Sequence, residues 1–90
     1  MKIEFDPAKR VATLADRGLD FLDAGLVFAG PTFSMVDDRI DYGERRWVTI
    51  GRLDERMVVL VWAERGTARR VISMRKANER EQARFNARLG

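Results

Sequence analysis

The sequence contains no cysteine and no histidine, and these two absences exclude much common enzyme chemistry. Without them the chain can form no disulfide, and it cannot assemble the usual ligand sets of zinc. The Ser–His and Cys–His pairs of nucleophilic hydrolases are excluded for the same reason. Glycine-rich phosphate loops and EF-hand spacings are absent too. We therefore expect no metal ion and no organic cofactor.

Long hydrophobic runs are also missing. No stretch approaches the roughly eighteen apolar residues of a membrane span, and residues 1–6 lack the apolar core of a signal peptide. We expect a cytoplasmic protein with no membrane partner. The 90 residues suffice for a single domain, 1–90, with one modest core.

Positive charge is concentrated in the last third of the chain. Residues 64–90 carry eight Arg or Lys against three Glu, whereas residues 1–63 carry nine basic against eleven acidic side chains. Fourteen of the seventeen basic residues are Arg, whose planar fork matches the oxygens of a phosphate. This distribution suits a polyanion such as RNA or an acidic protein partner, and it equally suits a solvated helix face.

Hydrophobic spacing predicts an α+β fold. Strands are expected at 2–5, 32–36, 47–51, 57–63 and 69–74, and helices at 8–17, 20–29 and from 79 onward. The first helix should bury Val11, Leu14 and Ala15. The last should begin with a capping box of Asn78 and Glu81, and that role accounts for Glu81. We expect an antiparallel sheet whose two N-terminal helices and one C-terminal helix pack on one face.

Six segments distributed along the chain form a recognisable series: IEFDPAKR (3–10), DRGLDF (16–21), FAGP (28–31), DDRIDYGERRW (37–47), ERG (64–66) and VISMRKANERE (71–81). They occur in the order in which the BrnT family of toxins has similar segments. The chain resembles this family along nearly its whole length. The resemblance implies a RelE-like fold and a growth-inhibiting ribonuclease toxin of a type II toxin–antitoxin module. It also implies an RNA substrate, a DNA-binding, BrnA-like antitoxin, and contact with operator DNA through that antitoxin.

Two positions depart from the family pattern. A His is usual in a Lys-His-Gly triplet where this chain has Asp16-Arg17-Gly18, and a Tyr is common where Phe85 stands. If either group transfers a proton in relatives, this protein must use another residue or be weakly active. The alternative function is therefore a catalytically weakened co-repressor that binds the antitoxin and operator DNA.

The last predicted strand carries most of the candidate site. By resemblance, Arg75 and Lys76 are catalytic and hold the scissile phosphate, the alternative being two solvated charges. Arg70 matches a recurrent family arginine and is the third catalytic candidate. Strict alternation instead places Arg69 with Ser73 and Arg75 on the open face, so Arg69 and Ser73 are RNA-binding candidates. A β-bulge would bring Arg70 round to that face.

Three further candidates lie at strand ends. Glu64 is the candidate general base, and its alternative role is a turn residue paired with an Arg on the next strand. Arg46 and Tyr42 are RNA-binding candidates; the alternatives are an ion pair of Arg46 with Glu44 and a place at the core edge for Tyr42. Such a set can promote attack of a ribose 2′-hydroxyl on its phosphate without a metal, leaving a 2′,3′-cyclic phosphate.

Overall fold

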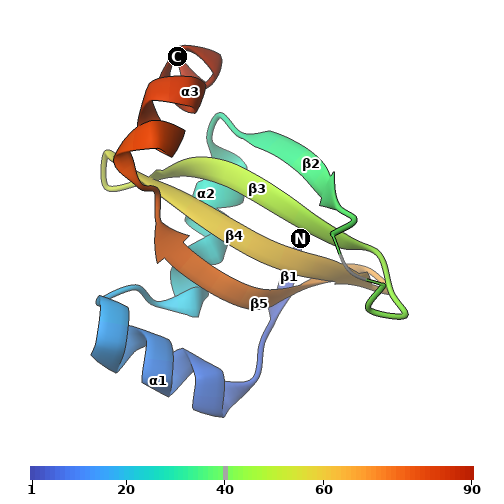
Figure 1. The fold of residues 1–90 in the computed structure, drawn as a ribbon. Coiled ribbons are helices and arrows are strands. Elements are labelled where there is room, and N and C mark those ends of the chain that lie inside the picture. Colours follow the sequence, from blue (N-terminus) through green and yellow to red (C-terminus); the bar gives the residue numbers. More distant parts are fainter. Residues whose placement is uncertain (40) are drawn as a thin grey trace.

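A five-stranded sheet in the order β1-β5-β4-β3-β2 forms the centre of the molecule (Figure 1). The computed structural model describes residues 1–39 and 41–90. The strands are β1 (Lys2–Glu4), β2 (Phe33–Asp37), β3 (Arg46–Leu53), β4 (Arg56–Arg65) and β5 (Ala68–Lys76). The helices are α1 (Pro7–Arg17), α2 (Ala24–Ala29) and α3 (Glu79–Leu89), with a 3-10 turn η1 (Phe21–Asp23) before α2. The α+β class and the order of the helices are confirmed.

The sheet is mixed rather than antiparallel. Strands β2 to β5 form the predicted antiparallel meander. Strand β1, however, pairs parallel with β5, from Lys2 opposite Ala68 to Glu4 opposite Arg70. Two strands so far apart in the sequence are not joined by a hairpin, and either direction is then available to them. The expectation of an all-antiparallel sheet was wrong at this edge.

The ends of α1 and α3 follow the capping signals of the sequence. Asp6 accepts a hydrogen bond from the backbone N–H of Ala8 at 2.9 Å, and Gly18 ends α1 in the left-handed conformation with φ of 69°. At α3, Asn78 and Glu81 form the predicted capping box. The second predicted helix is divided between η1 and α2, which Gly30 ends.

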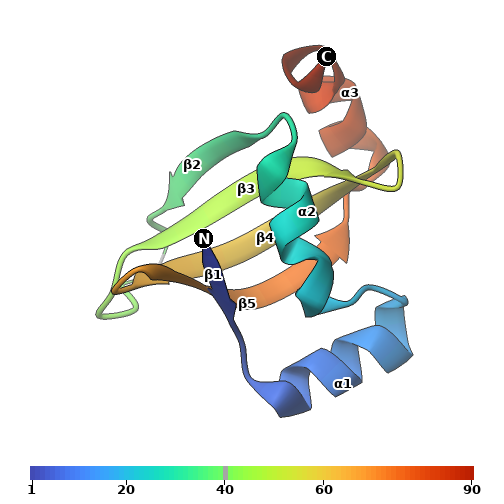
Figure 2. The ribbon, with the colours of Figure 1, turned by 180° about the vertical axis from the view of Figure 1, so that it is seen from behind.

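Helices α2 and α3 lie on opposite faces of the sheet, as Figures 1 and 2 show together. In the central strand β4, Val58, Leu60 and Trp62 pack in the core beneath α2, whereas Met57 and Val59 pack with α3. A strand that is apolar on both faces needs a cover on each. The expectation that all helices share one face was therefore wrong, although the apolar run of β4 already indicated two covered faces.

Helix α1 departs most from expectation, because none of its residues is buried. Val11 is 64% exposed, and Leu14 and Ala15 are exposed as well, so their predicted burial was wrong. Polar contacts connect the helix to the rest of the chain: Arg10 forms a two-bond ion pair with Asp20, at 2.7 and 2.9 Å. No helix among the described residues is long and apolar enough to cross a membrane.

Candidate functional site

A β-bulge in β5 decides which arginines share a face of the sheet. Val61 of β4 pairs with Ser73, but the next residue, Trp62, pairs with Val71. Ile72 is therefore an extra residue in β5. An extra residue shifts the alternation of side chains by one position on one side of the bulge.

Because of this shift, Arg69 and Arg70 exchange the faces that strict alternation predicts. The Cζ atom of Arg69 lies 4.5 Å from the ring centroids of both Phe28 and Trp62, on the face that α2 covers. Arg70, the next residue in the strand, points to the α3 face. The prediction that Arg69 lies on the open face was wrong, and the bulge considered for Arg70 is present.

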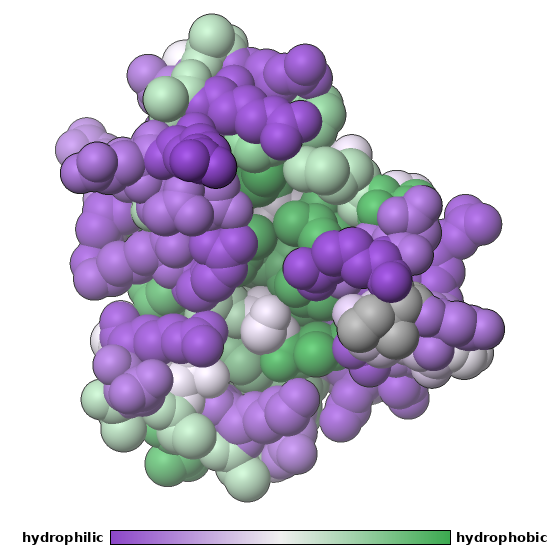
Figure 3. All heavy atoms as spheres, in the orientation of Figure 1, coloured by the Kyte–Doolittle hydropathy of each residue, from purple (hydrophilic) through white to green (hydrophobic). Residues whose placement is uncertain are grey.

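The α3 face is hollowed into a groove of about 470 Å³ where α3 leaves the sheet uncovered. In Figure 3 apolar side chains occupy the middle of this face, and hydrophilic ones flank them on both sides. The apolar lining comes from three strands and consists of Met35, Val36, Val48, Val59 and Val61. The polar lining consists of Asp37 at the end of β2, of Asp38 and Arg39 after it, and of Ser73, Arg75 and Glu81 from β5 and α3.

Arg75 is held in the groove by a two-bond contact with Glu81. The two Nη atoms of Arg75 donate to the carboxylate of Glu81 at 2.7 and 2.8 Å. These bonds hold the pKa of Glu81 at about 2 and raise the pKa of Arg75. Glu81 also accepts from the backbone N–H of Asn78. The side chain of Arg75 remains 44% exposed, so a substrate can reach a guanidinium whose orientation is already fixed.

Arg39 is held by Asp37 in the same way. Its Nε and Nη2 atoms donate to the Asp37 carboxylate at 2.8 and 3.0 Å, and these bonds lower the pKa of Asp37. The Asp37 side chain is only 2% exposed, whereas that of Arg39 is mostly open to solvent. Sequence reasoning missed both residues as site candidates. Their one signal was their place in the segment 37–47, which resembles the family.

Arg46 and Tyr42 lie at one end of this face. The register places Arg46, Ala63 and Arg70 side by side on neighbouring strands. Arg46 contacts Glu44 at 3.4 Å, and its Cζ atom lies 3.8 Å above the centroid of the Tyr42 ring. The ion pair considered as the alternative for Arg46 is thus present, and the Tyr42 ring packs against the Arg46 guanidinium.

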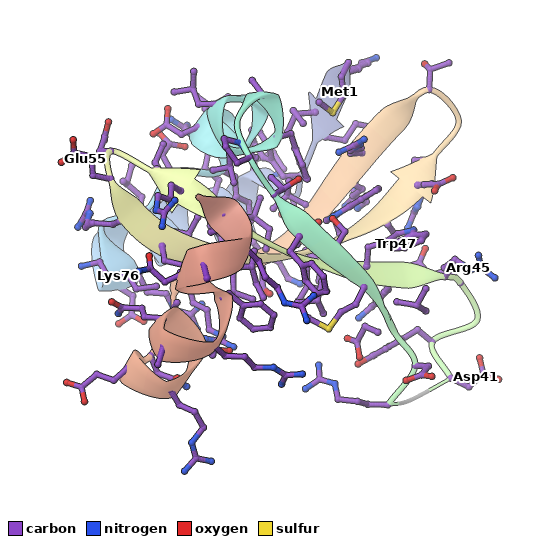
Figure 4. All side chains as sticks on the ribbon, turned by 90° about the horizontal axis from the view of Figure 1, so that it is seen from above. Met1, Asp41, Arg45, Trp47, Glu55 and Lys76 are labelled. Carbon is purple, nitrogen blue, oxygen red and sulfur yellow. The ribbon has the colours of Figure 1, made fainter. Side chains whose placement is uncertain are left out.

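The structure does not bring Glu64 or Lys76 into the groove. Glu64 is directly opposite Arg69, and Lys76 is directly opposite Val58. Since opposite residues share a face, Glu64 belongs to the α2 face. Lys76 lies at the end of the sheet, where it lines a separate hollow with Glu55 and Gln82. Figure 4 shows Lys76 near Glu55, at the end of the sheet away from Asp41 and Arg45. The predicted grouping of Glu64 and Lys76 with Arg75 therefore does not form.

The two positions that depart from the family pattern have contacts of their own. Nη1 of Arg17 donates to the backbone carbonyl of Met74 at 2.9 Å and so holds α1 against β5. Phe85 is buried in the core under α3, where its ring centroid lies 5.4 Å from that of Phe33. Arg17 and Phe85 therefore both have structural roles in this protein. Among residues 1–39 and 41–90, no group of three carboxylates is placed to hold a metal ion.

A groove lined by oriented guanidinium groups on a small sheet provides what binding of a nucleic-acid backbone requires. Residues 5–81 match the family model described as "Ribonuclease toxin, BrnT, of type II toxin-antitoxin system". The matched family is a class of ribonuclease toxins. The chain belongs to the BrnT family, and a type II system implies an antitoxin as its partner. No curated protein matches the chain significantly. All the polar groups that line the groove lie within the matched residues.

Proposed function

We propose that this protein halts growth as a metal-independent endoribonuclease that cleaves RNA in the groove between α3 and Arg39. The observation that carries the proposal is the contact between Arg75 and Glu81. Glu81 holds Arg75 in a fixed orientation in the groove, which Ser73 and apolar side chains also line. A guanidinium that is already oriented stabilises a phosphorane without further reorganisation. Arg70, which points to the same face, contributes a second positive charge.

In this reaction the ribose 2′-oxygen attacks the adjacent phosphorus, and the bond from phosphorus to the 5′-oxygen breaks. The leaving 5′-oxygen takes a proton from solvent water, so the products are a 2′,3′-cyclic phosphate and a 5′-hydroxyl. Among the carboxylates that line the groove, Glu81 is the one that touches Arg75, and in this proposal it accepts the 2′-hydroxyl proton. Because the bonds from Arg75 lower the pKa of Glu81 and make it a weak base, the proposal assigns most of the acceleration to charge stabilisation by Arg75.

The proposal extends to the fold and the partners of the toxin. The order of helices around a sheet that is antiparallel apart from β1 supports a RelE-like fold. A BrnA-like, DNA-binding antitoxin neutralises the toxin in the cytoplasm and carries it to operator DNA. The charge of the last third of the chain supports contacts with RNA.

Incubation of the purified protein with a defined transcript in excess chelator should give fragments with 2′,3′-cyclic phosphate ends. An RNA with 2′-deoxy substitution at the cleaved nucleotide is the control and should stay intact there, because it lacks the nucleophile. Cleavage that needs added magnesium, or that proceeds at the 2′-deoxy position, would contradict the proposed mechanism. A folded protein that leaves every RNA intact and arrests no cells would favour the co-repressor alternative.

A further inference from the structure

The groove has an arginine on each of two rims, and each arginine is held by its own carboxylate. Arg39 follows β2 and is fixed by Asp37, whereas Arg75 is the second-last residue of β5 and is fixed by Glu81. The two pairs come from opposite sides of the sheet, since β2 is an edge strand and β5 lies three strands away. Both arginines line the same cavity, with Ser73 on its wall.

The two guanidinium groups are close enough to act on each other. The bonds from Glu81 raise the pKa of Arg75, and the positive charge of Arg39 opposes that shift. Both guanidinium groups line the same groove, and each carboxylate holds its own arginine in place there. An anion bound between them is attracted by both guanidinium groups. A guanidinium has five N–H donors, and a carboxylate that binds two nitrogen atoms leaves others free for this anion.

We propose that Arg39 and Arg75 form a two-armed site that holds one phosphodiester of single-stranded RNA, with Arg39 as a phosphate-binding residue. This inference rests on the proposed function, because it assigns the substrate to the same groove. A single strand can place one phosphate between the arms and its sugar or base against the apolar floor. A double helix carries its phosphates on a broad convex surface, which does not enter a groove of this volume.

The test measures binding of a 2′-O-methyl RNA oligonucleotide, which resists cleavage, by fluorescence anisotropy at several salt concentrations. Arg39→Ala should weaken binding about tenfold and lower the salt slope by about one. Arg39→Lys should keep the salt slope but lose part of the RNA affinity, because lysine has the positive charge without the planar guanidinium group. Arg56→Ala is the control: Arg56 is an exposed arginine at the start of β4, outside the groove, and the variant should bind RNA like the unaltered protein.

The double variant Arg39→Ala/Arg75→Ala tests whether both arms hold the same phosphate. If the two arms are coupled, the fold loss of RNA affinity in the double variant should differ from the product of the fold losses in the two single variants. If Arg39→Ala binds like Arg56→Ala, or if the losses multiply independently, the two-armed site is overturned. The proposed function survives that result provided that Arg75→Ala still loses cleavage. If the unaltered protein neither binds nor cleaves RNA, both proposals fall.

Discussion

Replacement of Arg75 by alanine is expected to slow RNA cleavage about 100-fold or more, the usual effect of removing one preorganised group that stabilises developing charge. Glu81 fixes both Nη atoms of Arg75, so this guanidinium is already oriented in the groove. The fold should persist because the Arg75 side chain is partly exposed and Asn78 still caps α3. Initial rates on one transcript, together with circular dichroism spectra, measure both effects.

Arg80→Ala is the matched control, since Arg80 is exposed near the start of α3 and does not line the groove. It should cleave at the normal rate. Lys76→Ala is the informative comparison, because the family resemblance assigns Lys76 to the site whereas the structure places it outside the groove. Cells that express Arg75→Ala alone should grow. A folded Arg75→Ala protein with undiminished cleavage would remove Arg75 from the site.

The second large effect is expected in the core beneath α2, where Trp62→Ala should lower the free energy of unfolding by about 3–5 kcal/mol. The Trp62 ring stacks on Trp47 at 6.0 Å between centroids and meets the edge of Phe28 at 5.5 Å. Its Nε1 atom donates to Thr49 at 2.7 Å. The total free energy of unfolding of a domain of this size is only about 5–15 kcal/mol. The urea concentration at the midpoint of unfolding should therefore fall strongly.

Trp62→Phe separates the ring packing from the hydrogen bond. The substitution keeps much of the aromatic contact and removes the hydrogen bond to Thr49. The Thr49 hydroxyl still forms a hydrogen bond with the Ser34 hydroxyl at 2.7 Å. We expect a loss of about 1–2 kcal/mol, because the remaining hydroxyl partner limits the cost. Equal destabilisation by the two variants would show that the hydrogen bond, not packing, dominates at this position.

Local signals in the sequence predicted the elements well. Capping residues such as Asp6 and Asn78 act through bonds within a few residues of themselves, so helix ends could be read directly. The apolar run of β4 predicted a central strand for the same reason. The family membership followed from several segments in order, each weak alone.

The features that could not be predicted from the sequence depend on contacts between distant segments. The spacing of Val11 and Leu14 predicts an amphipathic helix, but nothing in it states what covers the apolar side. The bulge at Ile72 has no signature, because a β-branched residue suits a regular strand equally well. Without the bulge, Arg69 takes the place of Arg70. The pairing of Arg39 with buried Asp37 likewise depends on the folded turn after β2.

The central claim is that RNA binds the α3 face of the sheet. Titration of ¹⁵N-labelled protein with the 2′-O-methyl RNA, followed by amide chemical shifts, tests this claim most directly. The account predicts that the largest changes cluster at Arg39, Val61, Ser73 and Arg75, with Glu64 and Arg69 little affected. Changes centred on Glu64, Arg69 and α2 would place the RNA on the opposite face and contradict the account.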